Sequence, residues 1–120
     1  MNEKAEFVRS IYRDIDTREV GRLTAHLTDD CRFSFANHGT MIGRDSLEKF
    51  MIPFMSSLDG MVHEVDEVWD VDNEIMFRAK VSYTRKDGVV KSYPAAVFWK
   101  MRGEKVEDFS VYVDSSDLFN

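Results

Sequence analysis

Tyr93-Pro94-Ala95-Ala96-Val97-Phe98-Trp99 is a run without a single charge, and it decides how the second half of the chain is interpreted. A strand with one face in water alternates apolar and polar residues, so an uncharged run predicts a strand covered on both faces. Hairpin turns are predicted at Asp87-Gly88 before the run, at 102–104 after it, and at Asp72-Asn73 upstream. These turns predict an antiparallel meander of four strands, at 61–71, 74–85, 89–102 and 105–114.

The second face of this strand needs a cover that the helices upstream cannot supply, because they cover only one side of a sheet. A second copy of the chain is the simplest cover, and it predicts a homodimer. The expected interface lies on the convex sheet face, at Tyr93, Val97, Trp99 and Tyr112. A loop or tail folding back is the alternative, although few residues follow Asp114. Pro94 cannot donate a ladder hydrogen bond and is interpreted as a bulge.

The first half of the chain is predicted to form, in order, a helix, a second helix, a strand and a third helix. Residues 3–15 repeat apolar side chains at helical spacing. Capping boxes are predicted at 16–19, with Asp16 as N-cap, and at 45–48, each opening a helix. The second of these helices contains Pro53, which is expected to kink the helix or to divide it into two short pieces. A strand alternates over 31–36, and the order of elements predicts an α+β fold.

Composition bounds the function. The chain has 120 residues, 43% hydrophobic, which suits one domain over 1–120. A net charge of −6 argues against a nucleic-acid partner, and no apolar run is long enough to cross a membrane. The single cysteine, Cys31, excludes an internal disulfide, and no signal peptide is evident, so a cytoplasmic location is expected.

Three motifs carry a family resemblance. They are Leu-Thr-Asp-Asp-Cys-Arg-Phe at 27–33, Gly-Arg-Asp at 43–45, and Val-Tyr-Val-Asp-Ser-Ser-Asp-Leu at 111–118. In this order the chain resembles the nuclear transport factor 2-like superfamily, and within it the SnoaL-like (polyketide-cyclase-like) branch. The resemblance implies a cone-shaped fold, with three N-terminal helices packed on a curved, mainly antiparallel sheet. It also implies a pocket at the wide end and dimers through the convex face.

Two reactions known in this superfamily are excluded by the same resemblance. The positions of the steroid isomerases' two carboxylic acids and oxyanion-hole tyrosine fall on Phe35, Ala96 and Ile11, which are all apolar. The last-strand aspartate of the epoxide hydrolases falls on Val111. A hydrocarbon side chain cannot remove a proton, so neither reaction is expected.

The interior is predicted to be apolar. Its inward positions are Phe33, Phe35, Phe54, Ala96, Phe98, Phe109, Val111 and Val113. These side chains either fill a core or line a cavity for a small hydrophobic or aromatic molecule, and both interpretations stay open. Binding of such a molecule is the function that the sequence favours.

An enzyme is the alternative: an isomerase, lyase or cyclase for a small apolar substrate, using an acid–base pair of histidine and tyrosine. Its candidate catalytic residues are His38, His63 and Tyr12; His63 could point inward beside a carboxylate. Each also has a structural interpretation: a solvated loop, a satisfied strand end, a core edge. His26 is expected on the surface, and a pure association module is a third possibility. No histidine spacing indicates a metal, and no glycine fingerprint indicates a cofactor.

Overall fold

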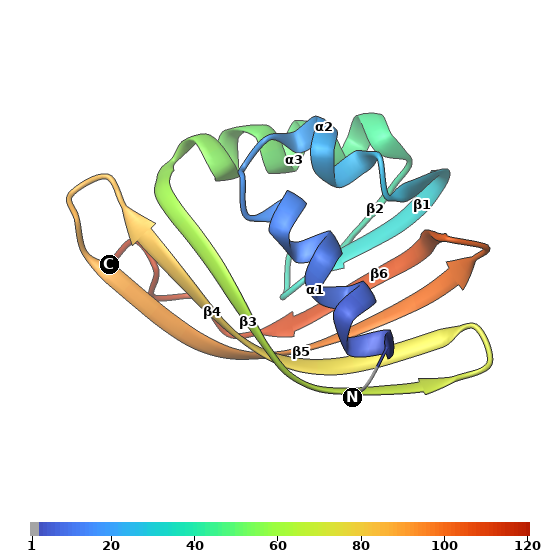
Figure 1. The fold of residues 1–120 in the computed structure, drawn as a ribbon. Coiled ribbons are helices and arrows are strands. Elements are labelled where there is room, and N and C mark those ends of the chain that lie inside the picture. The colour runs from blue at the N-terminus through green and yellow to red at the C-terminus, as the bar shows by residue number, and fades with distance from the viewer. Residues whose placement is uncertain (1–2) are drawn as a thin grey trace.

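Three helices lie on one face of a six-stranded sheet in the computed structural model, which describes residues 3–120 (Figure 1). The helices are α1 (Glu3–Ile15), α2 (Val20–Thr24) and α3 (Arg44–Ser56). The strands are β1 (Leu27–Phe35), β2 (Thr40–Ile42), β3 (Leu58–Val71), β4 (Glu74–Arg85), β5 (Val90–Arg102) and β6 (Lys105–Val113). The predicted α+β class, with its helices N-terminal to the meander, is confirmed. Within residues 3–120, none of the helices combines the length and the apolar character that a membrane crossing requires.

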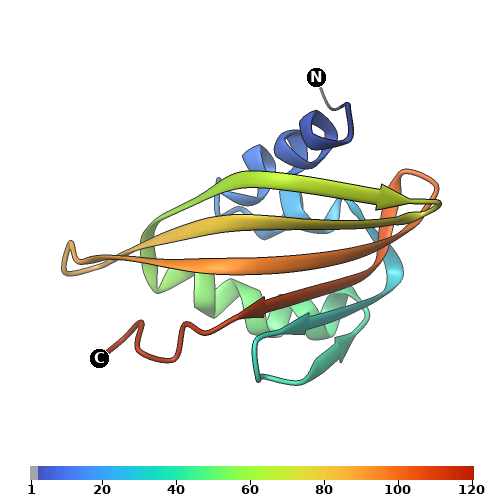
Figure 2. The same ribbon diagram turned by 90° about the horizontal axis from the view of Figure 1, so that it is seen from below.

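The strands follow the order β2-β1-β6-β5-β4-β3. Strands β3 to β6 form the predicted antiparallel meander, and β1 joins it parallel to β6. The short strand β2, which pairs with β1 as a hairpin, was not predicted. The sheet curves around the helices, whereas the outer face of β3 to β6 carries no helix (Figures 1 and 2). A register shift between Val65 and Val68 leaves an extra residue in β3, and one between Val106 and Asp108 leaves an extra residue in β6; such bulges bend a strand.

The prediction for the two faces of β5 was wrong by one residue. Tyr93, Val97 and Trp99 point inward and are buried, with Trp99 0% exposed, whereas Ala96 and Phe98 lie on the outer face. The reason is the turn before the strand. A two-residue turn at Asp87-Gly88 would pair Phe77 with Phe98, but Arg85 bonds to Val89 and the loop holds three residues. Phe77 therefore lies opposite Val97, and a shift of one residue exchanges the two faces of a strand.

Neither predicted N-cap holds. Glu19 precedes α2 and Gly43 precedes α3, and neither makes a side-chain cap bond. Gly43 has a φ of 87°, a conformation that glycine adopts without strain, so α3 begins one residue before Asp45. Asp16 does not cap α2; its carboxylate binds His63 instead, as described below.

The structure bears on the predictions for two prolines. Pro94 lies in regular register with Lys80, without a bulge. The last pair between β5 and β6 joins Ala95 to Val113, so no β6 residue lies opposite Pro94 to need its missing N–H. Pro53 lies inside α3, which runs through it as one helix.

Candidate functional site

An internal cavity lies between the inner face of the sheet and the helices. Its volume is about 40 Å³. Its lining is mostly apolar and comprises Tyr12, Ile15, Leu23, Phe33, Phe35, Met51, Phe54, Met61, His63, Tyr83, Phe109 and Val111. Four of the residues predicted to bind a ligand, Phe33, Phe35, Phe54 and Val111, therefore face this cavity, together with Phe109. Ala96 and Phe98 do not, because they lie on the outer face.

The inner positions of β5 next to the misplaced Ala96 are Ala95 and Val97. Both are apolar, so the corrected register still puts no carboxylate there. Phe35 lines the cavity and Ile11 is buried at 2% exposure. The side chains at the positions that the resemblance matches to the steroid isomerases are thus apolar.

A carboxylate and an imidazole nevertheless meet at the edge of this cavity. Asp16 Oδ1 accepts a hydrogen bond from His63 Nδ1 at 2.6 Å, and Asp16 Oδ2 accepts one from the His63 backbone N–H at 2.8 Å. Their side chains are 19% and 13% exposed. Asp16 directly follows α1 and continues its last turn through a bond from its N–H to Tyr12 O. The two bonds to one carboxylate fix the orientation of the imidazole and join the end of α1 to β3.

The free nitrogen of this imidazole has no partner among residues 3–120, since Nδ1 makes the only ring hydrogen bond there. With Nδ1–H donating to Asp16, the neutral ring carries its lone pair on Nε2. His63 lines the internal cavity as well as a separate surface cleft of about 320 Å³ between α1 and β3. Asp16, Arg9 and Arg13 line that cleft too, so the pair is in contact with both cavity and solvent.

Two buried phenols complete the polar part of the cavity. The ring of Tyr12 lies 4.4 Å from the His63 ring, and Tyr83 projects from β4. Burial raises the pKa of both Tyr12 and Tyr83 above the usual value, and the Asp16 carboxylate raises each further. Both hydroxyls therefore stay protonated at neutral pH. Within residues 3–120 neither finds a hydrogen-bond partner, so each can donate to a guest in the cavity.

His38 belongs to a different cavity. A basin of about 810 Å³ opens between the end of β1, α3 and the chain after β6. His38 is exposed at its rim, where its ring lies against Phe35 at 5.9 Å and Phe50 at 5.1 Å. Val113, predicted to face the pocket, lines this basin instead of the inner cavity. The structure thus joins two of the three candidate catalytic residues, Tyr12 and His63, and separates His38 from them.

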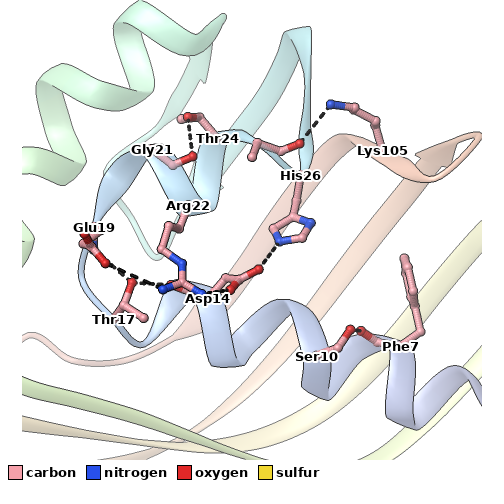
Figure 3. Close-up of polar contacts among 11 residues, drawn as sticks. Phe7, Ser10, Asp14, Thr17, Glu19, Gly21, Arg22, Thr24, His26 and Lys105 are labelled. Carbon is pink, nitrogen blue, oxygen red and sulfur yellow. Dashed lines mark hydrogen bonds and ion pairs between the residues drawn. The ribbon is translucent and has the colours of Figure 1, made fainter.

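A second carboxylate–imidazole pair lies outside these cavities. His26 Nε2 donates to Asp14 Oδ2 at 2.8 Å, and Arg22 binds the other oxygen (Figure 3). These contacts tie α1 to α2 and the start of β1. The pair is half-exposed and faces none of the cavities described above, so it holds elements together and offers no site.

Asp16 is the functional candidate that the sequence interpretation missed. Its spacing to Glu19 matched a capping box, and no local pattern connects it to His63, 47 positions away. The usable signal was His63 itself, for which an inward position beside a carboxylate was one of two interpretations and a satisfied strand end the other. Cys31 offers no second chemistry, because burial raises its thiol pKa to about 12. Across the residues that the structure describes, no three histidine, cysteine or acidic side chains are grouped to hold a metal ion.

Comparison with known proteins adds the family context. The sequence profile of the SnoaL-like domain matches residues 8–109. No curated protein matches the chain. Among solved structures, an NTF2-like protein of unknown function from Burkholderia pseudomallei superposes with a TM-score of 0.83 at 18% identity, covering 98% of this chain and 95% of that one.

Two further structures share the fold. A putative SnoaL-like polyketide cyclase from Jannaschia sp. CCS1 has a TM-score of 0.78 and 11% identity, covering 94% of this chain and 86% of that one. TerC, co-crystallized with polyporic acid, has a TM-score of 0.80 and 16% identity, covering 94% and 92%. At these identities the likeness extends to the fold alone.

Proposed function

Since this chain belongs to the SnoaL-like domain family, we propose that it binds a small apolar or aromatic molecule and exchanges a proton with it through His63. The observation that carries the proposal is the Asp16–His63 pair at the edge of an otherwise apolar cavity. An imidazole with a free Nε2 is a general base near neutral pH. Isomerases, lyases and cyclases that act beside a carbonyl share such a proton transfer.

Each polar group has a role in this scheme. His63 Nε2 takes a proton from carbon, and Asp16 acts as a positioning residue that holds Nδ1–H and stabilises the imidazolium. Tyr12 and Tyr83, kept protonated by burial, donate hydrogen bonds to the oxygen that gains charge. The surface cleft shared by His63 and Asp16 lets the proton reach solvent.

The ligand in this proposal is neutral and largely apolar. The linings of both the inner cavity and the basin contain aromatic rings and no lysine or arginine, so no permanently charged side chain there would pair with an anionic guest. TerC, a protein of this fold, was co-crystallized with polyporic acid, which supports a small organic guest in this fold. Ligand sites are commonly 300–1,000 Å³, a range that the basin meets and the inner cavity does not.

The test uses 2-tetralone, a small aromatic ketone, in deuterated water. Wild-type protein should accelerate replacement of the hydrogens beside the carbonyl by deuterium, followed by NMR. His63→Gln should lower that rate about 100-fold or more, as expected for loss of a general base. Asp16→Asn should lower it less, and His26→Gln, which alters the pair outside the cavities, should leave it unchanged.

Binding without catalysis is the second candidate, and the apolar lining of the basin favours it. Saturable binding of 2-tetralone with no accelerated exchange would support it and contradict the catalytic role of His63. Equal losses in His63→Gln and His26→Gln would also contradict that role, because both would then act through stability.

We also propose that two copies associate through the outer sheet face, in a cytoplasmic setting. The supporting observation is an apolar patch, which we call the outer patch: Trp69, Met76, Ala96, Phe98 and Tyr112. Strand register connects its members, since Trp69 pairs with Met76 and Met76 with Phe98. Trp69, Met76 and Tyr112 are 47%, 52% and 66% exposed, which is unusual for such side chains in a monomer.

Light scattering tests the association. Phe98→Glu should convert dimers to monomers, whereas Val90→Glu, on the same strand and face but about 26 Å away, should not. A monomeric wild type, or a Phe98→Glu dimer as stable as the wild type, would contradict the proposed interface.

A further inference from the structure

Two cavities of very different size meet at one pair of side chains. The inner cavity with His63 holds about 40 Å³, room for roughly one water, whereas the basin holds about 810 Å³. Phe35 and Phe54 line both. A ligand that enters from the basin must therefore displace one of these rings before it reaches His63.

The two rings differ in how firmly their elements hold them. Phe35 is buried in β1, whose backbone pairs with β6 at Val111. Phe54 is half-buried on the last turn of α3, directly after Pro53. Pro53 has no N–H, so this turn lacks one of its helical hydrogen bonds. Phe54 is thus the less buried of the two rings and lies on the less regular backbone.

The place that Phe54 occupies is itself an aromatic site. Its ring meets Tyr83 edge-on at 5.6 Å, Phe35 at 5.8 Å, and stacks near Phe50 at 6.1 Å. Aromatic pairs prefer such offset and edge-to-face contacts. A guest ring of similar size would find the same three partners and would bring its polar substituent toward Tyr83 and His63.

We infer that Phe54 is the gate of the site and that the ligand carries one aromatic ring, which takes the place of the Phe54 ring. The inference rests on the proposed ligand site and adds its size limit. Phe54 sets that limit because its swing frees the space of one ring.

The three histidines report on the inference separately. His38 lies at the basin, His63 at the inner cavity and His26 at neither. p-Cresol is the probe, titrated into protein with isotope-labelled histidine and followed by NMR of the imidazole signals. Histidine-to-glutamine variants assign the signals.

Phe54→Ala should bind p-cresol at least 10-fold more tightly than wild type, with the His63 signal shifting and the His26 signal fixed. Phe50→Ala is the matched control, because Phe50 lines the basin alone; it should shift His38 without tightening the response of His63. If Phe54→Ala does not fold, as judged by loss of signal dispersion, Phe54→Leu replaces it with the same expectation.

Equal tightening in Phe50→Ala, or a His63 signal that stays fixed in Phe54→Ala while His38 saturates, would overturn the gate. So would a wild-type affinity at His63 equal to that of Phe54→Ala. The result is independent of catalysis: His63 can respond to p-cresol even if 2-tetralone exchanges no deuterium, which would contradict the proposed reaction alone.

Discussion

The end of α1 carries two carboxylates two residues apart, Asp14 and Asp16, and each binds an imidazole from another element. Asp14 binds His26 at 2.8 Å and Asp16 binds His63 at 2.6 Å. Asp14 is also bound by Arg22, so its carboxylate is paired with a guanidinium as well as with an imidazole (Figure 3). Asp16 has no arginine or lysine within ion-pair distance among residues 3–120. Its imidazole borders a cavity, whereas His26 borders none.

The difference teaches that a carboxylate–imidazole contact is not itself a functional signal. Asp14 lies in a network in which every charge has a partner, and this network joins α1 to α2. Asp16 leaves an imidazole with one fixed and one free nitrogen, beside two phenols without partners in the described chain. The environment of the pair, and not its chemistry, separates a structural clamp from a candidate catalytic site.

The largest expected effect separates the pairs by stability. Asp16→Ala removes the acceptor of both the His63 backbone N–H and Nδ1–H, leaving two donors partly buried without a partner. We expect a loss of about 2–3 kcal/mol in the free energy of unfolding, measured with urea. Asp14→Ala should lose less, because water can solvate its exposed partners.

The reverse ranking would break the comparison. If Asp14→Ala destabilised the protein more than Asp16→Ala, the outer network would be the dominant link of α1. Asp16→Asn is the conservative control: its amide oxygen still accepts one bond, so its loss of stability should be the smaller of the two Asp16 variants.

A smaller effect concerns pH and the outer pair. Hydrogen bonds from His26 and then Arg22 lower the pKa of Asp14 below its usual value. The folded state therefore binds fewer protons at this group than the unfolded state, so ionised Asp14 stabilises the fold at neutral pH. That stability is lost as pH falls below about 4, through the lowered pKa.

The stability gap between wild type and Asp14→Asn should thus hold down to about pH 5 and close towards pH 3 in urea unfolding series. In a His26→Gln background the gap should already be smaller at neutral pH, and 1 M salt should reduce it further. A gap that persists undiminished at pH 3 would show that Asp14→Asn acts through packing.

The sequence predicted the fold more completely than the site. Helical spacing over 3–15 gave the bounds of α1, and the turns gave the four meander strands, because both patterns are local. The two faces of β5 were assigned wrongly because both are apolar. The alternation of apolar and polar residues therefore could not show which face points inward. The choice depended on one extra residue in the turn after Arg85, which no composition rule fixes.

The prediction of the site was incomplete for a different reason. His63 was identified as a candidate and Asp16 was not, because Asp16 fits a helix-capping pattern whose local evidence is good. Its true partner lies on β3, and only the packing of α1 against that strand brings the two together. Long-range pairs of this kind leave no trace in local spacing. The apolar lining of the cavity at Phe33, Phe35 and Phe54 could be predicted because it follows from local patterns.

The smallest expected effect tests whether the phenols beside the inner pair are held for a guest. Tyr12→Phe removes the hydroxyl of a cavity-lining residue that has no hydrogen-bond partner within residues 3–120, so the free energy of unfolding should change by less than about 0.5 kcal/mol. Tyr93→Phe is the matched comparison, because the Tyr93 hydroxyl donates to Asp117 Oδ1 at 2.6 Å; it should lose about 1 kcal/mol or more. Urea unfolding measures both, and deuterium exchange of 2-tetralone should fall in Tyr12→Phe alone. If Tyr12→Phe destabilised the protein as much as Tyr93→Phe, its hydroxyl would be a structural bond, and the inner pair would resemble the outer one in having every polar group already engaged.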